Sequence, residues 1–119
     1  MAPIPTPSQQ KTYPEKRAMM NEYIVLMHND AVDRAAADDG EQWGAYMSAL
    51  RQGGGFDGGS AMGLGICVNK AGVARSASQL TGYIRVRAES LDHARQCLMG
   101  NPVYEAGGTI EICELPKDS

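Results

Sequence analysis

The chain lacks the residue patterns that mark most metal, nucleotide and disulfide proteins. Its three cysteines, Cys67, Cys97 and Cys113, are odd in number and form neither a CxxC pair nor a Cys/His ligand pattern. We therefore expect buried free thiols in a reducing cytoplasm, with no structural zinc and no other cofactor. The one match to GxGxxG, at 53–58, follows a predicted helix instead of opening one, so it does not indicate a dinucleotide site.

Basic clusters and long apolar runs are also missing. The net charge is −3 and the isoelectric point is about 5.3, with no grouping of lysine and arginine. Because phosphate groups are bound through a basic surface, we expect no nucleic-acid or anionic-membrane partner. No apolar run approaches the ~20 residues that span a bilayer, and no signal peptide opens the sequence. These features favour a cytoplasmic protein.

The first residues differ in composition from the rest of the chain. Residues 1–17 contain four prolines and many polar side chains, with no apolar period. Such a segment has little apolar surface to bury, so we expect residues 1–21 to form a disordered, proline-rich tail. Residues 22–119 then make one domain, which suits the length of the chain.

The C-terminal third predicts a strand, a helix and a second strand. Apolar residues alternate along 81–87 and 109–115, and they recur every three to four residues along 90–99. Ser90 is a suitable N-cap for the helix, and Gly100-Asn101-Pro102 is a suitable stop.

The N-terminal half predicts the same order. Residues 23–28 form a strand that is apolar on both faces. Asp38 and Asp39 stand three residues before Glu41 and Gln42, which is typical of a capping box at the start of a helix. That helix has one apolar face, made of Trp43, Tyr46, Met47 and Leu50.

Glycines at 53–55 end the first helix, and short strands are predicted at 56–62 and 65–68. The full order is an α+β, ferredoxin-like split β-α-β arrangement with an extra hairpin between its halves. In such a fold both helices cover one face of the sheet. Because strand 23–28 is apolar on both faces, we expect a second copy of the chain to cover the other face in a homodimer.

The sequence resembles the YCII-related family, which includes the DGPF-like proteins. The similarity lies in YIVLMHND at the first strand, GGSAMG (58–63), LTGYIRV, SLDHARQCLMGNP and GGTIEICELP, within residues 22–116. The resemblance implies a dimeric α/β barrel with two facing sheets. The DGPF segment itself would fall near 70–73 and is lost, and the family's proposed catalytic histidine would fall near Trp43 and is absent. Neither motif therefore transfers a catalytic role.

One histidine and one strand carry the candidate site residues. His28 ends the first strand beside a loop, where it is either a hydrogen-bonded structural residue or a catalytic acid or base. Arg85 and Arg87 alternate with apolar residues on a strand and share a face with Tyr83; Glu111 occupies the same face. These charges either form ion pairs, with Glu111 as the partner, or line a cavity between facing sheets where an arginine binds a carboxylate.

Two classes of function fit these residues. One is a protein that binds a small anionic molecule in a cleft of the dimer, using Arg85, Arg87, Tyr83 and Glu111. The other is a cofactor-independent enzyme of lyase or dehydrochlorinase type, with His28 as acid or base and an arginine as anion clamp. A fold alone does not choose between them.

Deletion of residues 1–20 tests the proposed tail. Because the segment has little apolar surface, the truncated protein should keep a melting temperature within a few degrees of that of the full chain. Thermal unfolding followed by circular dichroism provides the measurement. A large loss of stability would show that the tail packs on the domain.

Overall fold

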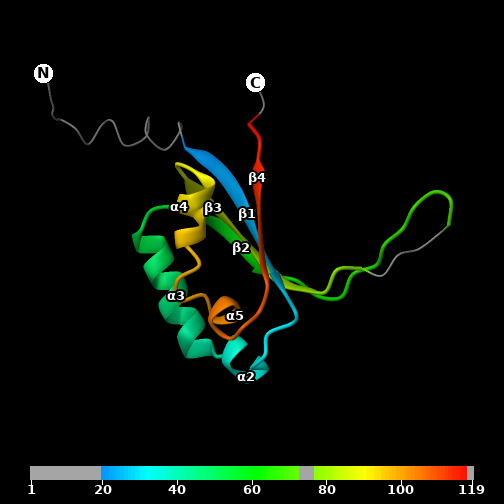
Figure 1. Ribbon diagram of the computed structural model, residues 1–119, viewed down its shortest axis with the longest axis horizontal. Helices are drawn as coiled ribbons and strands as arrows, with labels where there is room; N and C mark the ends of the chain where they lie inside the picture. The colour runs from blue at the N-terminus through cyan, green and yellow to red at the C-terminus, as the bar shows by residue number, and fades with distance from the viewer. Residues whose placement is uncertain (1–19, 73–76, 118–119) are drawn as a thin grey trace, which may run out of the picture.

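The computed structural model describes residues 20–72 and 77–117 (Figure 1). Nearly all of the predicted tail lies outside the described residues. Within the described part, none of the helices is long and apolar enough to cross a membrane.

Four strands form one antiparallel sheet in the order β2-β3-β1-β4. The strands are β1 (Asn21–His28), β2 (Phe56–Ala61), β3 (Leu80–Ala88) and β4 (Ile110–Leu115). The predicted α+β class is confirmed, and the strand order is compatible with a ferredoxin-like fold. Since β1 and β3 are central, β2 and β4 are the two edges of the sheet.

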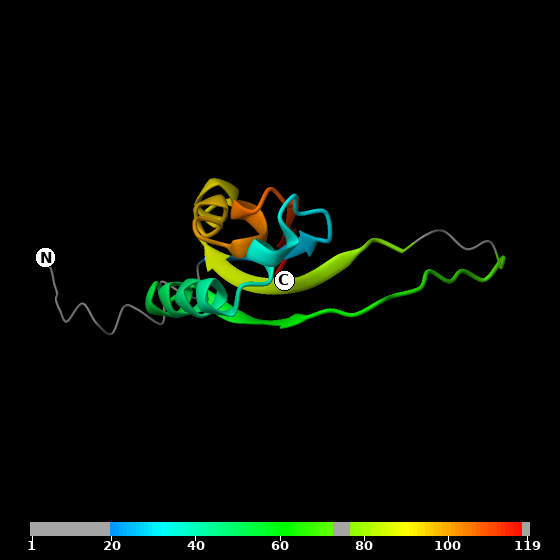
Figure 2. The same ribbon diagram turned by 90° about the horizontal axis from the view of Figure 1, so that it is seen from below.

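The helices lie together on one side of the sheet (Figures 1 and 2). They are α2 (Arg34–Ala37), α3 (Gly40–Gln52), α4 (Leu91–Gln96) and α5 (Pro102–Glu105). The short helices α2 and α5 were not predicted, because a four-residue helix shows no apolar period.

Two predicted helix starts are confirmed. Asp39 is the N-cap of α3, and its side chain accepts hydrogen bonds from the backbone N–H groups of Glu41 and Gln42. Ser90 is the N-cap of α4 and accepts from the His93 N–H. The α4 helix ends at Gln96, earlier than its apolar period indicated.

The core lies between the helices and one face of the sheet. Tyr23, Val25 and Met27 of β1 are buried there with Ile84 and Val86 of β3. The alternation predicted this side for Ile84 and Val86, whereas strand 23–28 was expected to be apolar on both faces. From α3, the whole predicted apolar face packs on this core: Tyr46 and Leu50 are buried, and Trp43 and Met47 are partly buried.

The predicted strand at 65–68 is wrong. Residues 62–72 and 77–79, which we call the arm, continue from the ends of β2 and β3 and project away from the domain (Figures 1 and 2). The 65–68 segment does alternate apolar and small residues as a strand would. No described segment of the same chain pairs with it, however, so no ladder forms.

Asn101 is the only polar or charged side chain that is fully buried among the described residues. Its Oδ1 accepts hydrogen bonds from the N–H groups of Val103 and Tyr104 at 3.0 and 3.1 Å, which caps α5. Its Nδ2 donates to the Met27 sulfur at 3.5 Å. The cap therefore links the α4–α5 connection to the central strand.

Replacing Asn101 with alanine should destabilise the protein by about 2 kcal/mol, because the change removes the cap and leaves the buried Val103 N–H and the partly buried Tyr104 N–H without their acceptor. Urea unfolding measures the loss. Ser90→Ala is the matched control, since it removes an exposed N-cap and should cost about 1 kcal/mol. Equal losses for the two variants would contradict the role of Asn101 as a buried link.

Candidate functional site

The sequence-predicted site residues lie on the face of the sheet that the helices leave uncovered, which we call the open face. Side chains from all four strands share it, because they alternate with the buried row in the strand register. They include Glu22, Ile24, Leu26, His28, Asp57, Tyr83, Arg85, Arg87, Glu111, Cys113 and Leu115.

His28 and Glu111 form a pair at one end of the open face. An N–H on His28 Nε2 donates to Glu111 Oε1 at 3.2 Å across the β1–β4 ladder. Glu111 was the ion-pair partner in one of the two interpretations of the arginines, and the structure pairs it with His28 instead. The histidine is thus hydrogen-bonded within its own chain, as the structural interpretation of this residue requires.

The two arginines pair with other carboxylates. Arg85 lies 3.2 Å from Glu22 and 3.9 Å from Asp57, and Arg87 lies 3.1 Å from Asp57. Asp57 follows Phe56, which pairs with the buried Val86, so alternation places Asp57 on the open face beside Arg85; the β2–β3 register then shifts before Gly59. The shift is a bulge that includes Gly58, whose φ of +104° is a conformation that glycine adopts without strain. Both arginine charges are therefore compensated inside the chain.

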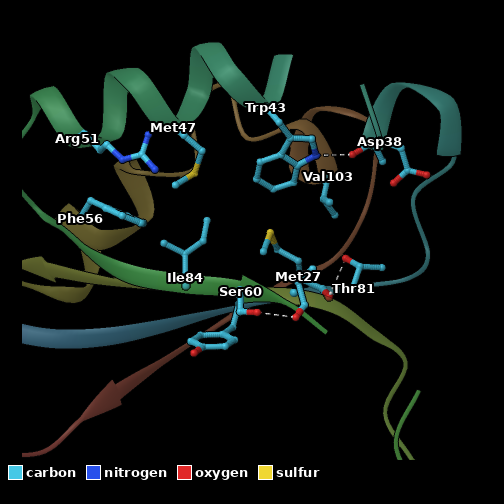
Figure 3. Close-up of a pocket in the computed structure, with 15 residues that line it drawn as sticks. Met27, Asp38, Trp43, Met47, Arg51, Phe56, Ser60, Thr81, Ile84 and Val103 are labelled. Carbon is cyan, nitrogen blue, oxygen red and sulfur yellow. Dashed lines mark hydrogen bonds between the residues drawn. The ribbon is translucent and has the colours of Figure 1, made fainter. Parts of the chain in front are cut away.

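A separate cavity of about 420 Å³ lies on the other side of the sheet, under α3 (Figure 3). We call it the α3 cavity. Of the sequence-predicted site residues only Tyr83 borders it, and neither His28 nor the two predicted arginines do. Its walls are mostly apolar and are formed by Met27, Trp43, Met47, Phe56, Ile84 and Val103.

The cavity exists because the part of its floor beside Ile84 carries almost no side chains. Gly59, Ala61 and Gly82 line it from the β2–β3 pair. A Cβ at Gly59 would lie 2.5 Å from the Tyr83 carbonyl oxygen, and one at Gly82 would lie 3.0 Å from the Ser60 oxygen. Close pairing of the two strands thus demands glycine, and glycine leaves the space under α3 unfilled.

Trp43 is fixed on the α3 side of the cavity. Its indole projects from the helix toward the sheet, and Nε1 donates to the Ala37 carbonyl at 2.8 Å (Figure 3). The indole also meets Tyr46 edge to face, with ring centroids 5.9 Å apart. Since the Trp43 N–H is already satisfied, the ring offers the cavity an apolar surface in a defined orientation.

Two charged residues stand at opposite ends of the cavity (Figure 3). Asp38 is paired with Arg34 at 3.0 Å. Arg51 lies with its guanidinium 5.3 Å from the centre of the Phe56 ring, a cation–π contact. Among the described residues, no carboxylate lies within ion-pair distance of Arg51, so its charge is available to an anion.

Sequence reasoning found part of this site. Trp43 and Met47 were recognised as apolar helix residues, but Arg51 was not recognised as belonging with them. The signal was present, because the three residues lie at i, i+4 and i+8 and therefore share a side of α3. Gly59 and Gly82 were not recognised as positions that leave a cavity.

The cysteines differ from the expected buried thiols. Cys67 and Cys113 are free and exposed, since one lies on the arm and the other on the open face. Cys97 is half-buried, and burial raises the pKa of its thiol, which favours the neutral form. In the described ranges, no three His, Cys, Asp or Glu side chains are close enough together to hold a metal ion.

The remaining shifted groups are structural. Burial raises the pKa of Tyr46, whose hydroxyl donates to the Cys97 carbonyl at 2.7 Å and so ties α3 to the end of α4. Hydrogen bonds from the Thr109 hydroxyl and N–H lower the pKa of Asp30, which joins the loop after β1 to the start of β4. Neither group lines the α3 cavity.

Comparison with known proteins identifies no relative of this chain. No protein-family model matches the chain, and no curated protein matches it significantly.

Proposed function

We propose that this protein binds a small anionic molecule, apolar over most of its length, in the α3 cavity. The observation that carries the proposal is the Arg51 guanidinium, which has no carboxylate partner among the described residues and stands at one end of a cavity with mainly apolar walls. Asp38 at the other end is paired with Arg34. An apolar pocket with one convergent charged group is the usual form of a small-molecule site. The volume of about 420 Å³ falls in the range of such sites.

The charge on Arg51 favours a carboxylate or similar anion. A guanidinium forms charge-assisted, bidentate hydrogen bonds with a carboxylate, and these bonds strengthen in an apolar setting. The Trp43 ring and the flexible Met47 side chain would contact the apolar part of the ligand. This proposal keeps the anionic ligand expected from the sequence and assigns the cation to Arg51 in place of Arg85 and Arg87.

The assembly that we propose is the facing-sheet homodimer of a YCII-related, dimeric α/β-barrel protein. Supporting it, Ile24, Leu26 and Leu115 place apolar surface on the open face, where water now has partial access. The ion pairs around them already satisfy the neighbouring charges. A second copy can therefore cover the face without leaving an unpaired charge.

Octanoate and octan-1-ol form a matched pair of probes for the α3 cavity. Trp43 is the single tryptophan of the chain, so its fluorescence reports binding directly. We expect both probes to change the emission and octanoate to bind more tightly. Arg51→Gln should weaken octanoate binding roughly tenfold while leaving octanol binding unchanged, because only the carboxylate uses the guanidinium.

The control for this experiment is Arg95→Gln. Arg95 is on α4, is mostly exposed and does not line the α3 cavity, so its loss should alter neither affinity. If both variants weaken octanoate binding equally, the effect of Arg51→Gln comes from the change in net charge and not from a lost contact with the carboxylate. If neither probe binds the unmodified protein, the cavity is not the ligand site.

Light scattering at about 10 µM tests the homodimer and should give twice the chain mass of 12.7 kDa. Leu26→Asp should reduce the mass to that of a monomer, because it places a charge at the centre of the open face, between Tyr83 and Glu111. Val32→Asp is the control, since this exposed loop residue lies outside the open face. If the unmodified protein has the mass of one chain, the facing-sheet dimer is excluded.

A further inference from the structure

The arm carries three of the four most exposed large apolar side chains in the described part of the chain. Leu64, Ile66 and Val68 have exposed fractions of 101%, 85% and 80%. Single exposed apolar residues are ordinary, but these three recur at every second position of an extended segment and so share one side of it. A row of this kind is the pattern of a strand with one face to bury.

The backbone of the arm is also available for pairing. The last ladder contact is the bond from the Met62 N–H to the Thr81 carbonyl at 3.0 Å. Beyond it, residues 63–68 take part in no backbone–backbone hydrogen bond with any described residue. Extended backbone with unpaired N–H and C=O groups pairs readily with the edge of a sheet.

The β4 edge offers such a site together with an apolar groove. The strand has β1 on one side only, so its other side is unpaired within the described fold. Because α4 and α5 are short, they leave a groove of about 750 Å³ beside the strand. The apolar side chains that line it are Leu91, Leu98, Met99, Tyr104, Ile110 and Ile112.

We infer that the arm of one copy docks as an added strand on the β4 edge of a second copy. Leu64, Ile66 and Val68 then fill the partner's groove, on the helix side of its sheet. The intervening residues Gly63, Gly65 and Cys67 face the opposite side, which in β4 carries Glu111 and Cys113. This contact rests on the proposed homodimer and adds to it a second surface, which the facing sheets do not use.

A second copy is the occupant that fits the groove best. The arm projects away from its own domain in both views, so it does not cover the β4 edge of its own chain (Figures 1 and 2). Together the arm and the groove supply about two dozen residues per copy, within the 20–30 that each side of a standard interface contributes. If each arm docks on the other copy, the contact is reciprocal and closes at two chains.

Disulfide trapping tests the placement of the arm. The background is full-length Cys97→Ser protein, in which residue 67 already carries a thiol. In two further variants Cys67→Ser is combined with Gly65→Cys or with Gly63→Cys, which moves the thiol by two or by four residues along the same side of the arm. A Cβ at either glycine meets no atom within 4 Å. With oxidised glutathione as the electron acceptor, one of the three positions should give a covalent dimer through Cys113, since paired strands bring Cα atoms within disulfide range. Ile66→Cys with Cys67→Ser is the control, because its thiol would enter the groove on the other side of the sheet.

The product should disappear when Cys113 is replaced by serine. Leu64→Asp with Ile66→Asp should raise the dimer dissociation constant at least tenfold without changing the circular dichroism spectrum, because both side chains are exposed in the single chain. A dimer that forms no Cys113 cross-link at any of the three positions would overturn the arm contact and leave the facing-sheet dimer standing. A protein that is monomeric throughout would overturn both, while octanoate binding would still report on the α3 cavity.

Discussion

The pairing of β2 with β3 has no room for a side chain at two points, and much of the molecule depends on this constraint. Gly59 and Gly82 let the two backbones approach, since a Cβ at either position would press on a carbonyl oxygen of the opposite strand. The same absence of side chains leaves a bare floor under α3. The helix is held above that floor by the Trp43 and Tyr46 hydrogen bonds to other segments, so the space persists as a cavity.

The charged side chains on the two sides of the sheet differ in whether they have a partner. This difference suits the open face to assembly and the helix side to ligand binding. On the open face every arginine and the histidine have a carboxylate partner in the same chain. Such a face can be covered by protein without desolvating an unpaired charge. On the helix side, Arg51 has an aromatic ring beside it and no carboxylate partner among the described residues, which leaves its charge for a bound molecule.

The sequence predicted the fold well because its signals were local. Asp39 and Ser90 mark the helix starts as N-caps, and the alternation in β3 and β4 shows which side chains face the helices. The partners of the arginines were not predictable, because cross-strand neighbours depend on which strands lie side by side and in which register. Asn101 was missed for a similar reason: a stop signal between helices gives no sign that its side chain is fully buried.

The bulge at Gly58 also makes the two edges of the sheet unequal. An edge strand with a register shift and several glycines presents an irregular row of backbone groups, and such irregularity protects natural sheets against edge-to-edge association. The β4 edge is regular through all six paired positions with β1. Strand addition is therefore favoured at β4 and disfavoured at β2, so in the assembly that we propose only one edge of each copy would accept an added strand.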